Sequence, residues 1–312
     1  VNQGLPLVAD IQASQAQGGA TLHIQGPLAN LLLKAQLSLR QPEGRNQQSL
    51  TLGGEIQPFA AWPVSHLTAS VKNLNLADLH ASLPDSGLQG QISLQPTAKK
   101  ALQAKLDMRN DRAGAWSDQR LPVRSLRGQI LLPDVHAAND LAQAWRQGEL
   151  DLVAQLPTVA GQTPGDLAVS GGWGGQRVLQ ARWHKLEPQA LYDRAPPLQL
   201  DGGLQLKPDW ASMGSKASEA NWARLRSSLD LKMSGLFGPS FSSRPIKTLR
   251  KSDVPVSLVL DGRYGPGQFD VSVLRLQAQS AQAELRDAVL RWVVPGAPST
   301  SLRAPAPSWS AK

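Results

Sequence analysis

Histidine is the side chain best suited to proton transfer and metal binding near neutral pH, so the five histidines come first. They are scattered along the chain, and no two have the short spacing of an H-x-x-x-H or H-E-x-x-H pair that would bring two ring nitrogens to one metal ion. The five are His23, His66, His80, His136 and His184. We interpret each as a surface or strand-edge residue, and we expect no metal site and no cofactor.

Other residues with chemical potential also lack the required spacing. Residues Gly171–Gly175 read GGWGG, which fits neither a dinucleotide fingerprint nor a Walker loop and predicts a turn around Trp173. Asp107, Asp111 and Asp118 are close in sequence, but only Asp107 falls on a clear strand, facing outward. There is no G-x-S-x-G elbow, and without cysteine there is no thiol nucleophile. The sequence favours a binding or structural protein, not an enzyme.

The charge balance is basic, with 32 Lys and Arg against 24 Asp and Glu, a net charge of +8. The basic residues are dispersed, and the densest cluster, Lys247–Lys251, is short, so the composition argues against nucleic acid. It suits a solvated surface or anionic lipid headgroups. The lack of cysteine fits an oxidising compartment. Because the chain begins in mid-pattern and ends in a Pro/Ser/Ala-rich tail, we expect an interior segment of a longer protein.

Strict alternation of apolar and polar residues dominates the chain and predicts β-strands. In residues 102–109, LQAKLDMR, every second residue is apolar and the others are polar. Similar segments predict about fourteen to sixteen strands. Gly53-Gly54 predicts a bulge or turn, and Asp261–Gly267 predicts a hairpin connection. The alternation slips by one residue at Leu274, which predicts a β-bulge.

Helical signals are few and short, at about residues 75–83, 137–145, 187–192 and 218–225. Some of them recur in a loose repeat, in which a short helical turn leads into a strand with glycine near its start. The repeats cover residues 76–94 and 186–206, with a weaker copy at 141–152. We predict one repetitive β segment over residues 1–294 and a linker over 295–312.

The apolar faces of so many strands need a cover. At ~4.8 Å per strand, the sheet would be on the order of 70 Å across, and the helices are too short to cover it. A membrane barrel is disfavoured, because aromatic residues make up only 5% of the chain and the predicted strands are short. A second sheet, forming a sandwich, and an open trough that holds something apolar both remain. The Leu, Val, Ile and Ala residues would give the trough an aliphatic wall suited to acyl chains.

Several ordered motifs resemble the TamB family, the translocation and assembly module subunits within the AsmA-like, bridge-like lipid transfer superfamily of Gram-negative bacteria. They are residues 56–63 (IQPFAAWP), 74–79 (LNLADL), 88–92 (LQGQI), 110–123 and the meander 254–292. The resemblance implies a mainly β fold, in which an extended, twisted, mostly antiparallel sheet curls into an open hydrophobic groove with a few short helices. It also implies a periplasmic location, with an N-terminal inner-membrane anchor and an Omp85-type outer-membrane partner, both engaged by regions outside this segment.

The function implied by the resemblance is a conduit that carries phospholipids between the inner and outer membranes. The predicted groove lining consists of Leu33, Leu37, Leu39, Leu88, Ile92, Leu94, Leu102, Leu106, Met108, Leu150, Leu152, Leu156, Leu204, Leu206, Leu229, Leu231, Val256, Leu258, Leu260, Val271 and Val273. The alternative is a scaffold whose open sheet edge assembles outer-membrane proteins or autotransporters by β-augmentation. A plain β-sandwich for adhesion or carbohydrate binding is a third possibility.

Overall fold

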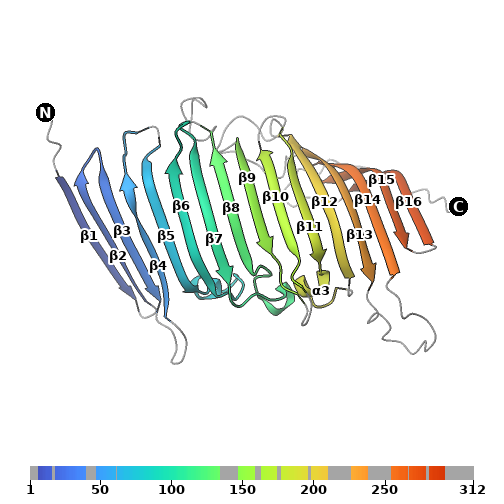
Figure 1. Cartoon of the computed structure of the whole chain (residues 1–312), viewed down its shortest axis with the longest axis horizontal. Coiled ribbons are helices and arrows are strands. Elements are labelled where there is room, and N and C mark those ends of the chain that lie inside the picture. The colour runs from blue at the N-terminus through green and yellow to red at the C-terminus, as the bar shows by residue number, and fades with distance from the viewer. Residues whose placement is uncertain are drawn as a thin grey trace.

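The fold is one antiparallel sheet of sixteen strands arranged in chain order from β1 to β16. The computed structural model describes residues 6–15, 18–39, 47–60, 62–133, 147–158, 163–173, 177–195, 198–209, 226–237, 254–265, 267–278 and 281–291. Figure 1 shows the strands side by side, with β1 and β16 at opposite ends of the sheet. The mainly β, antiparallel prediction and the expected number of strands are confirmed, whereas the described sheet is open and uncurled and does not show the predicted groove.

Every strand pairs with its neighbours in sequence, as expected when alternating segments are joined by short connections. The strands are β1 (Pro6–Gln15), β2 (Gly18–Pro27), β3 (Leu31–Leu39), β4 (Gln48–Ile56), β5 (Val64–Leu74), β6 (Leu88–Pro96), β7 (Leu102–Asn110), β8 (Ser125–Leu132), β9 (Gly148–Gln155), β10 (Asp166–Trp173), β11 (Leu179–Leu186), β12 (Leu198–Asp209), β13 (Arg226–Phe237), β14 (Val254–Gly265), β15 (Gln268–Ala278) and β16 (Ala281–Arg291). In the described part of the chain, no helix is long and apolar enough to cross a membrane.

The two stronger copies of the predicted repeat have the same backbone geometry. A register shift occurs near the end of β5, at Asn73, and near the end of β11, at Lys185, positions 112 residues apart. Both residues have left-handed φ angles, 51° and 49°. Each shift is followed by a four-residue helix, α1 (Leu76–Leu79) or α3 (Pro188–Leu191), as the sequence predicted. The helices predicted at 137–145 and 218–225, and the linker at 295–312, lie outside the described residues.

The turn around α1 is held by buried polar side chains. The Asn75 side-chain oxygen accepts hydrogen bonds from the backbone N–H groups of Ala77 (3.2 Å) and Ser86 (3.0 Å), which makes Asn75 the helix N-cap. In the second copy Glu187 holds this position and accepts a hydrogen bond from the Thr158 hydroxyl at 3.1 Å. The two copies therefore share one backbone shape, while a different residue, Asn75 or Glu187, occupies the N-cap position.

Two local predictions are wrong, because pairing with neighbouring strands overrides local turn preference. Gly53-Gly54 does not interrupt β4, and the register shift falls between Glu55 and Ile56. Gly171, Gly172 and Trp173 lie inside β10, not in a turn, while Gly174 and Gly175 lie outside the described residues. The hairpin connection predicted over Asp261–Gly267 is confirmed, because β14 and β15 pair antiparallel, but β14 extends to Gly265 and so includes most of that range. The β-bulge predicted before Leu274 is confirmed opposite Asp261 and Gly262.

Glycine is required where strands approach most closely. Gly90 in β6 and Gly128 in β8 both have φ of +147°, which side chains rarely adopt. A Cβ atom on Gly90 would lie 2.1 Å from the Asp107 carbonyl oxygen of β7. Gly90 thus allows β6 to stay paired with β7, and Gly128 allows β8 to stay paired with β9.

Candidate functional site

One face of the sheet carries three apolar rows that cross all sixteen strands without a polar residue. The cross-strand pairing defines each row, and its members are Ala, Val, Leu, Ile, Met, Trp or Gly. The middle one, called here the central apolar row, consists of Ile11, Leu22, Ala35, Leu52, Ala69, Ile92, Leu106, Gly128, Leu152, Val169, Ala181, Leu204, Leu231, Leu260, Leu274 and Leu285.

The central apolar row is not covered by any described part of the chain. None of its sixteen residues is buried; most are half-buried between their neighbours, while Ile11 is 55% and Ile92 41% exposed. In a β-sandwich, the middle of the inner face would be a buried core. The described chain therefore leaves an aliphatic strip uncovered, running perpendicular to the strands for about 70 Å at ~4.8 Å per strand.

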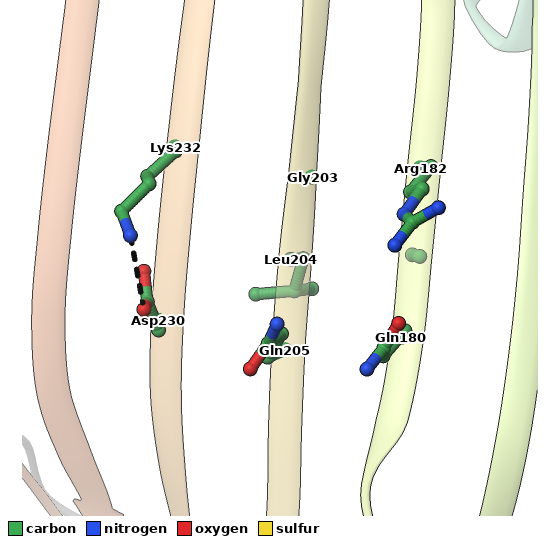
Figure 2. Close-up of a pocket in the computed structure, with 8 residues that line it drawn as sticks. Gln180, Arg182, Gly203, Leu204, Gln205, Asp230 and Lys232 are labelled. Carbon is green, nitrogen blue, oxygen red and sulfur yellow. Dashed lines mark hydrogen bonds and ion pairs between the residues drawn. The ribbon is translucent and has the colours of Figure 1, made fainter.

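The opposite face of the sheet is mostly polar. Figure 2 shows Gln180, Gln205 and Asp230 in front of neighbouring strands, with Arg182 and Lys232 flanking Gly203 in the next row. Leu204 lies behind the ribbon, on the apolar face. Hollows lie on this face, for example the one in Figure 2 and one lined by Ser93, Lys105 and Asp151. The sheet thus has one polar face, which suits contact with water, and one apolar face, which suits an apolar ligand.

Ion pairs link neighbouring strands across the polar face. Arg127 pairs with Asp107 at 2.9 Å, which confirms that Asp107 faces outward. His184 pairs with Asp201, and Glu284 accepts from Arg275 and Arg286. The two arginines lower the pKa of Glu284 by hydrogen bonding, Arg286 first. Such exposed pairs add little stability each.

His23 gives a pH-dependent contact between β1 and β2. Its ring bonds to the Asp10 carboxylate, and this hydrogen bond, with a smaller one to Gln25, raises the pKa of His23 above 6.5. The stabilisation is therefore present below pH 6.5 and is lost as the pH rises through the folded-state pKa. We expect an NMR titration of the His23 ring to show a midpoint above 6.5, and Asp10→Asn to lower it. Equal midpoints in the two proteins would contradict the contact.

Most of the predicted lining residues lie together on the apolar face. Fifteen lie in the three apolar rows: Leu33, Leu37, Ile92, Leu94, Leu106, Met108, Leu150, Leu152, Leu204, Leu206, Leu229, Leu231, Leu258, Leu260 and Val271. Five lie beyond these rows, toward the strand ends: Leu39, Leu88, Leu102, Leu156 and Val256. Leu102, Leu156 and Val271 are buried, so they are less accessible than the rest.

Val273 is the exception among the predicted lining residues. The β-bulge in β15 pairs Val273 with Asp261, whereas Val271 pairs with Gly262 and Leu274 with Leu260. Asp261 in turn pairs with Asp230 on the polar face. Val273 therefore belongs to the polar face. The extra residue of the bulge lies before Val273, so the side chains change faces there, whereas the apolar pattern in the sequence changes only at Leu274.

The prediction also left out residues that complete the apolar rows. Ile11, Leu22, Leu52, Val169 and Leu285 belong to the central apolar row. The alternation of their segments was the available signal. The glycine members, such as Gly128, carry no hydropathy signal and are placed in the row only by strand pairing.

A small core around Trp62 lies at one rim of the sheet, beside β6, β7 and β8. This side chain is 5% exposed and packs with Leu102 and Leu132, with Leu94 and Trp173 beside them. The indole N–H donates to the Lys100 carbonyl at 2.7 Å. Trp62 is thus a core residue, whereas Trp116 in the 3₁₀ helix η1 (Trp116–Asp118) is 57% exposed.

Comparison with known proteins gives no match among family models, curated proteins or solved structures. Among the described residues, no group of three or more His, Cys, Asp or Glu could hold a metal ion. The candidate site is therefore defined by its own geometry, as an extended aliphatic surface.

Proposed function

We propose that the apolar face binds phospholipid acyl chains and that this segment carries phospholipids through the periplasm between the inner and outer membranes, in support of outer-membrane biogenesis. The observation that supports it is the central apolar row, which crosses sixteen strands with no polar interruption and no covering layer in the described chain. The resemblance to the TamB family supports the periplasmic location. It also supports a lipid path that runs along the sheet from strand to strand.

Acyl chains suit this surface for a physical reason. Each CH₂ group removed from water contributes about 0.8 kcal/mol, so a chain of about sixteen carbons would be retained by many small contributions. Because aliphatic residues repeat every ~4.8 Å, neighbouring positions on the row offer similar energies. A ligand could therefore move along the row without meeting a deep trap or a polar barrier.

The sheet would hold its ligand better if it curled. We propose that the open sheet bends into a groove around the acyl chains, with the apolar rows inside and the charged face in water. Twisted sheets of this width commonly curl. The partner at the outer membrane, an Omp85-type protein, would bind through regions outside this segment.

The alternative function is a scaffold that assembles outer-membrane proteins or autotransporters on an open sheet edge. It is favoured by β1, an edge strand whose Val8 is 65% exposed and whose outer backbone groups pair with no described strand. Such an edge can accept a further strand by β-augmentation. This function uses the backbone of the edge, whereas lipid binding uses side chains across the whole sheet.

Crosslinking in cells separates the two functions. A photoreactive amino acid at Leu106, in the middle of the central apolar row, is expected to capture phospholipid. The same probe at Gln129, next to it on the polar face, is the matched control and should capture none. Capture of unfolded outer-membrane protein at Val8, with no lipid captured at Leu106, would contradict the conduit and favour the scaffold.

A further inference from the structure

Three tight turns on one rim of the sheet present apolar and basic residues to solvent. The turn between β2 and β3 exposes Leu28 (49%), and the turn between β4 and β5 exposes Phe59 (79%). The turn between β6 and β7 carries the exposed lysines Lys99 and Lys100. We call the described residues of these three turns, 27–30, 57–60, 62–63 and 97–101, the Phe59 rim.

The turns of the Phe59 rim form a contiguous, rigid surface. Leu31 pairs with Ile56, which places the first two turns side by side. The Trp62 indole donates to the Lys100 carbonyl at 2.7 Å and so joins the second turn to the third. Each turn is closed by backbone hydrogen bonds, for example from Asn30 to the Pro27 carbonyl at 2.7 Å and from Ala60 to the Gln57 carbonyl at 2.9 Å. The turns would therefore lose little conformational entropy on binding.

The charges of the Phe59 rim have one sign. Residues 27–30, 57–63 and 97–101 contain two lysines and no Asp or Glu. The opposite rim, where α3 is labelled in Figure 1, has charges of both signs: its loops 75–87 and 111–124 carry Asp78, Asp85, Asp111 and Asp118 beside Arg112, Arg120 and Arg124. Bulky apolar tips beside lysines are the composition of surfaces that enter the headgroup region of anionic bilayers.

We propose that the Phe59 rim docks on an anionic membrane surface, with Leu28 and Phe59 inserted at the headgroup level and Lys99 and Lys100 against lipid phosphates. The partner is a lipid surface and not a protein, because the protruding residues are isolated turn tips flanked by cations, without the flat apolar area of a stable protein interface. Docking uses the rim and acyl-chain binding uses the apolar face, so either can fail without the other.

Vesicle sedimentation tests the docking directly. The 312-residue chain is mixed with vesicles of phosphatidylglycerol and phosphatidylethanolamine, or of phosphatidylcholine alone. We expect binding to the anionic vesicles. Joint substitution Leu28→Ser and Phe59→Ser should weaken binding about tenfold on both vesicle types. Joint substitution Lys99→Gln and Lys100→Gln should weaken it about twentyfold, on anionic vesicles only.

The opposite rim provides the matched control. Leu79 and Trp116 are 48% and 57% exposed there, and Leu79→Ser with Trp116→Ser should leave vesicle binding unchanged. Leu106→Arg changes the apolar face and leaves the Phe59 rim intact, so its effect on lipid transfer tests the proposed function separately from docking. The proposal is overturned if the native chain ignores anionic vesicles, or if the control pair weakens binding as much as the rim pair does. It is equally overturned if the rim pair alters self-association in sedimentation velocity and leaves vesicle binding intact.

Discussion

Substituting Leu106→Arg or Leu204→Glu is expected to slow phospholipid transfer by tenfold or more while the sheet stays folded. Both residues lie in the central apolar row, where Leu106 pairs with Ile92 and Gly128. A charged side chain beside an acyl chain must lose hydration, and placing Arg in a hydrocarbon environment costs about 2.5 kcal/mol or more. That cost corresponds to a factor of about sixty or more if the whole of it is felt during transfer, and about tenfold if only part of it is. Transfer of a fluorescent phospholipid between donor and acceptor vesicles measures it.

The folded state should tolerate these charges, because no described layer covers the face and the new side chain can reach water when lipid is absent. Gln205→Glu is the matched control for Leu204→Glu, since Gln205 is the next residue and faces the polar side (Figure 2). It should transfer lipid at the native rate. Normal transfer by both apolar-face variants, with circular dichroism unchanged, would contradict the conduit.

Trp62→Ala is expected to cause the largest loss of stability of any single truncation discussed here, about 3 kcal/mol or more. The substitution empties the small core formed with Leu102 and Leu132 and leaves the Lys100 carbonyl without its indole donor. Trp116→Ala, at an exposed tryptophan, is the control and should change the free energy of unfolding by about 0.5 kcal/mol or less.

The effect of Trp62→Ala should also be local, because the residues that pack with Trp62, namely Leu94, Leu102, Leu132 and Trp173, belong to β6, β7, β8 and β10. Chemical denaturation measures the free energy of unfolding, and hydrogen exchange locates the loss. Faster exchange is expected near β5, β7 and β8 and not in β14 or β15. Uniform acceleration along the whole sheet would show that the sheet unfolds as one unit.

Much of the fold could be predicted from the sequence, because a period of two is a local signal. Residues 102–109 alternate without a break, and β7 (Leu102–Asn110) follows them closely. The short helix after Asn75 could also be predicted, since a capping side chain precedes apolar residues at helical spacing and Pro84 follows. The face on which each residue of an uninterrupted strand lies follows from the same alternation.

The remaining features depend on pairing with neighbouring strands, which the alternation of apolar and polar residues does not specify. Gly53-Gly54 resembles a turn locally, yet β3 and β5 pair with it on both sides and keep it extended. Val273 changes face because of a bulge whose position is set by pairing with β14. The full apolar rows appear only when the register of all sixteen strands is known, since their glycines look neutral in sequence.

Native mass spectrometry of the purified chain, with extraction and identification of any bound lipid, tests the central claim most directly. We predict that phospholipid copurifies with the native chain and that Leu106→Arg and Leu204→Glu reduce the bound fraction while Gln205→Glu does not. A native chain that carries no phospholipid, from membranes where phospholipid is abundant, would contradict the claim that the apolar face binds acyl chains.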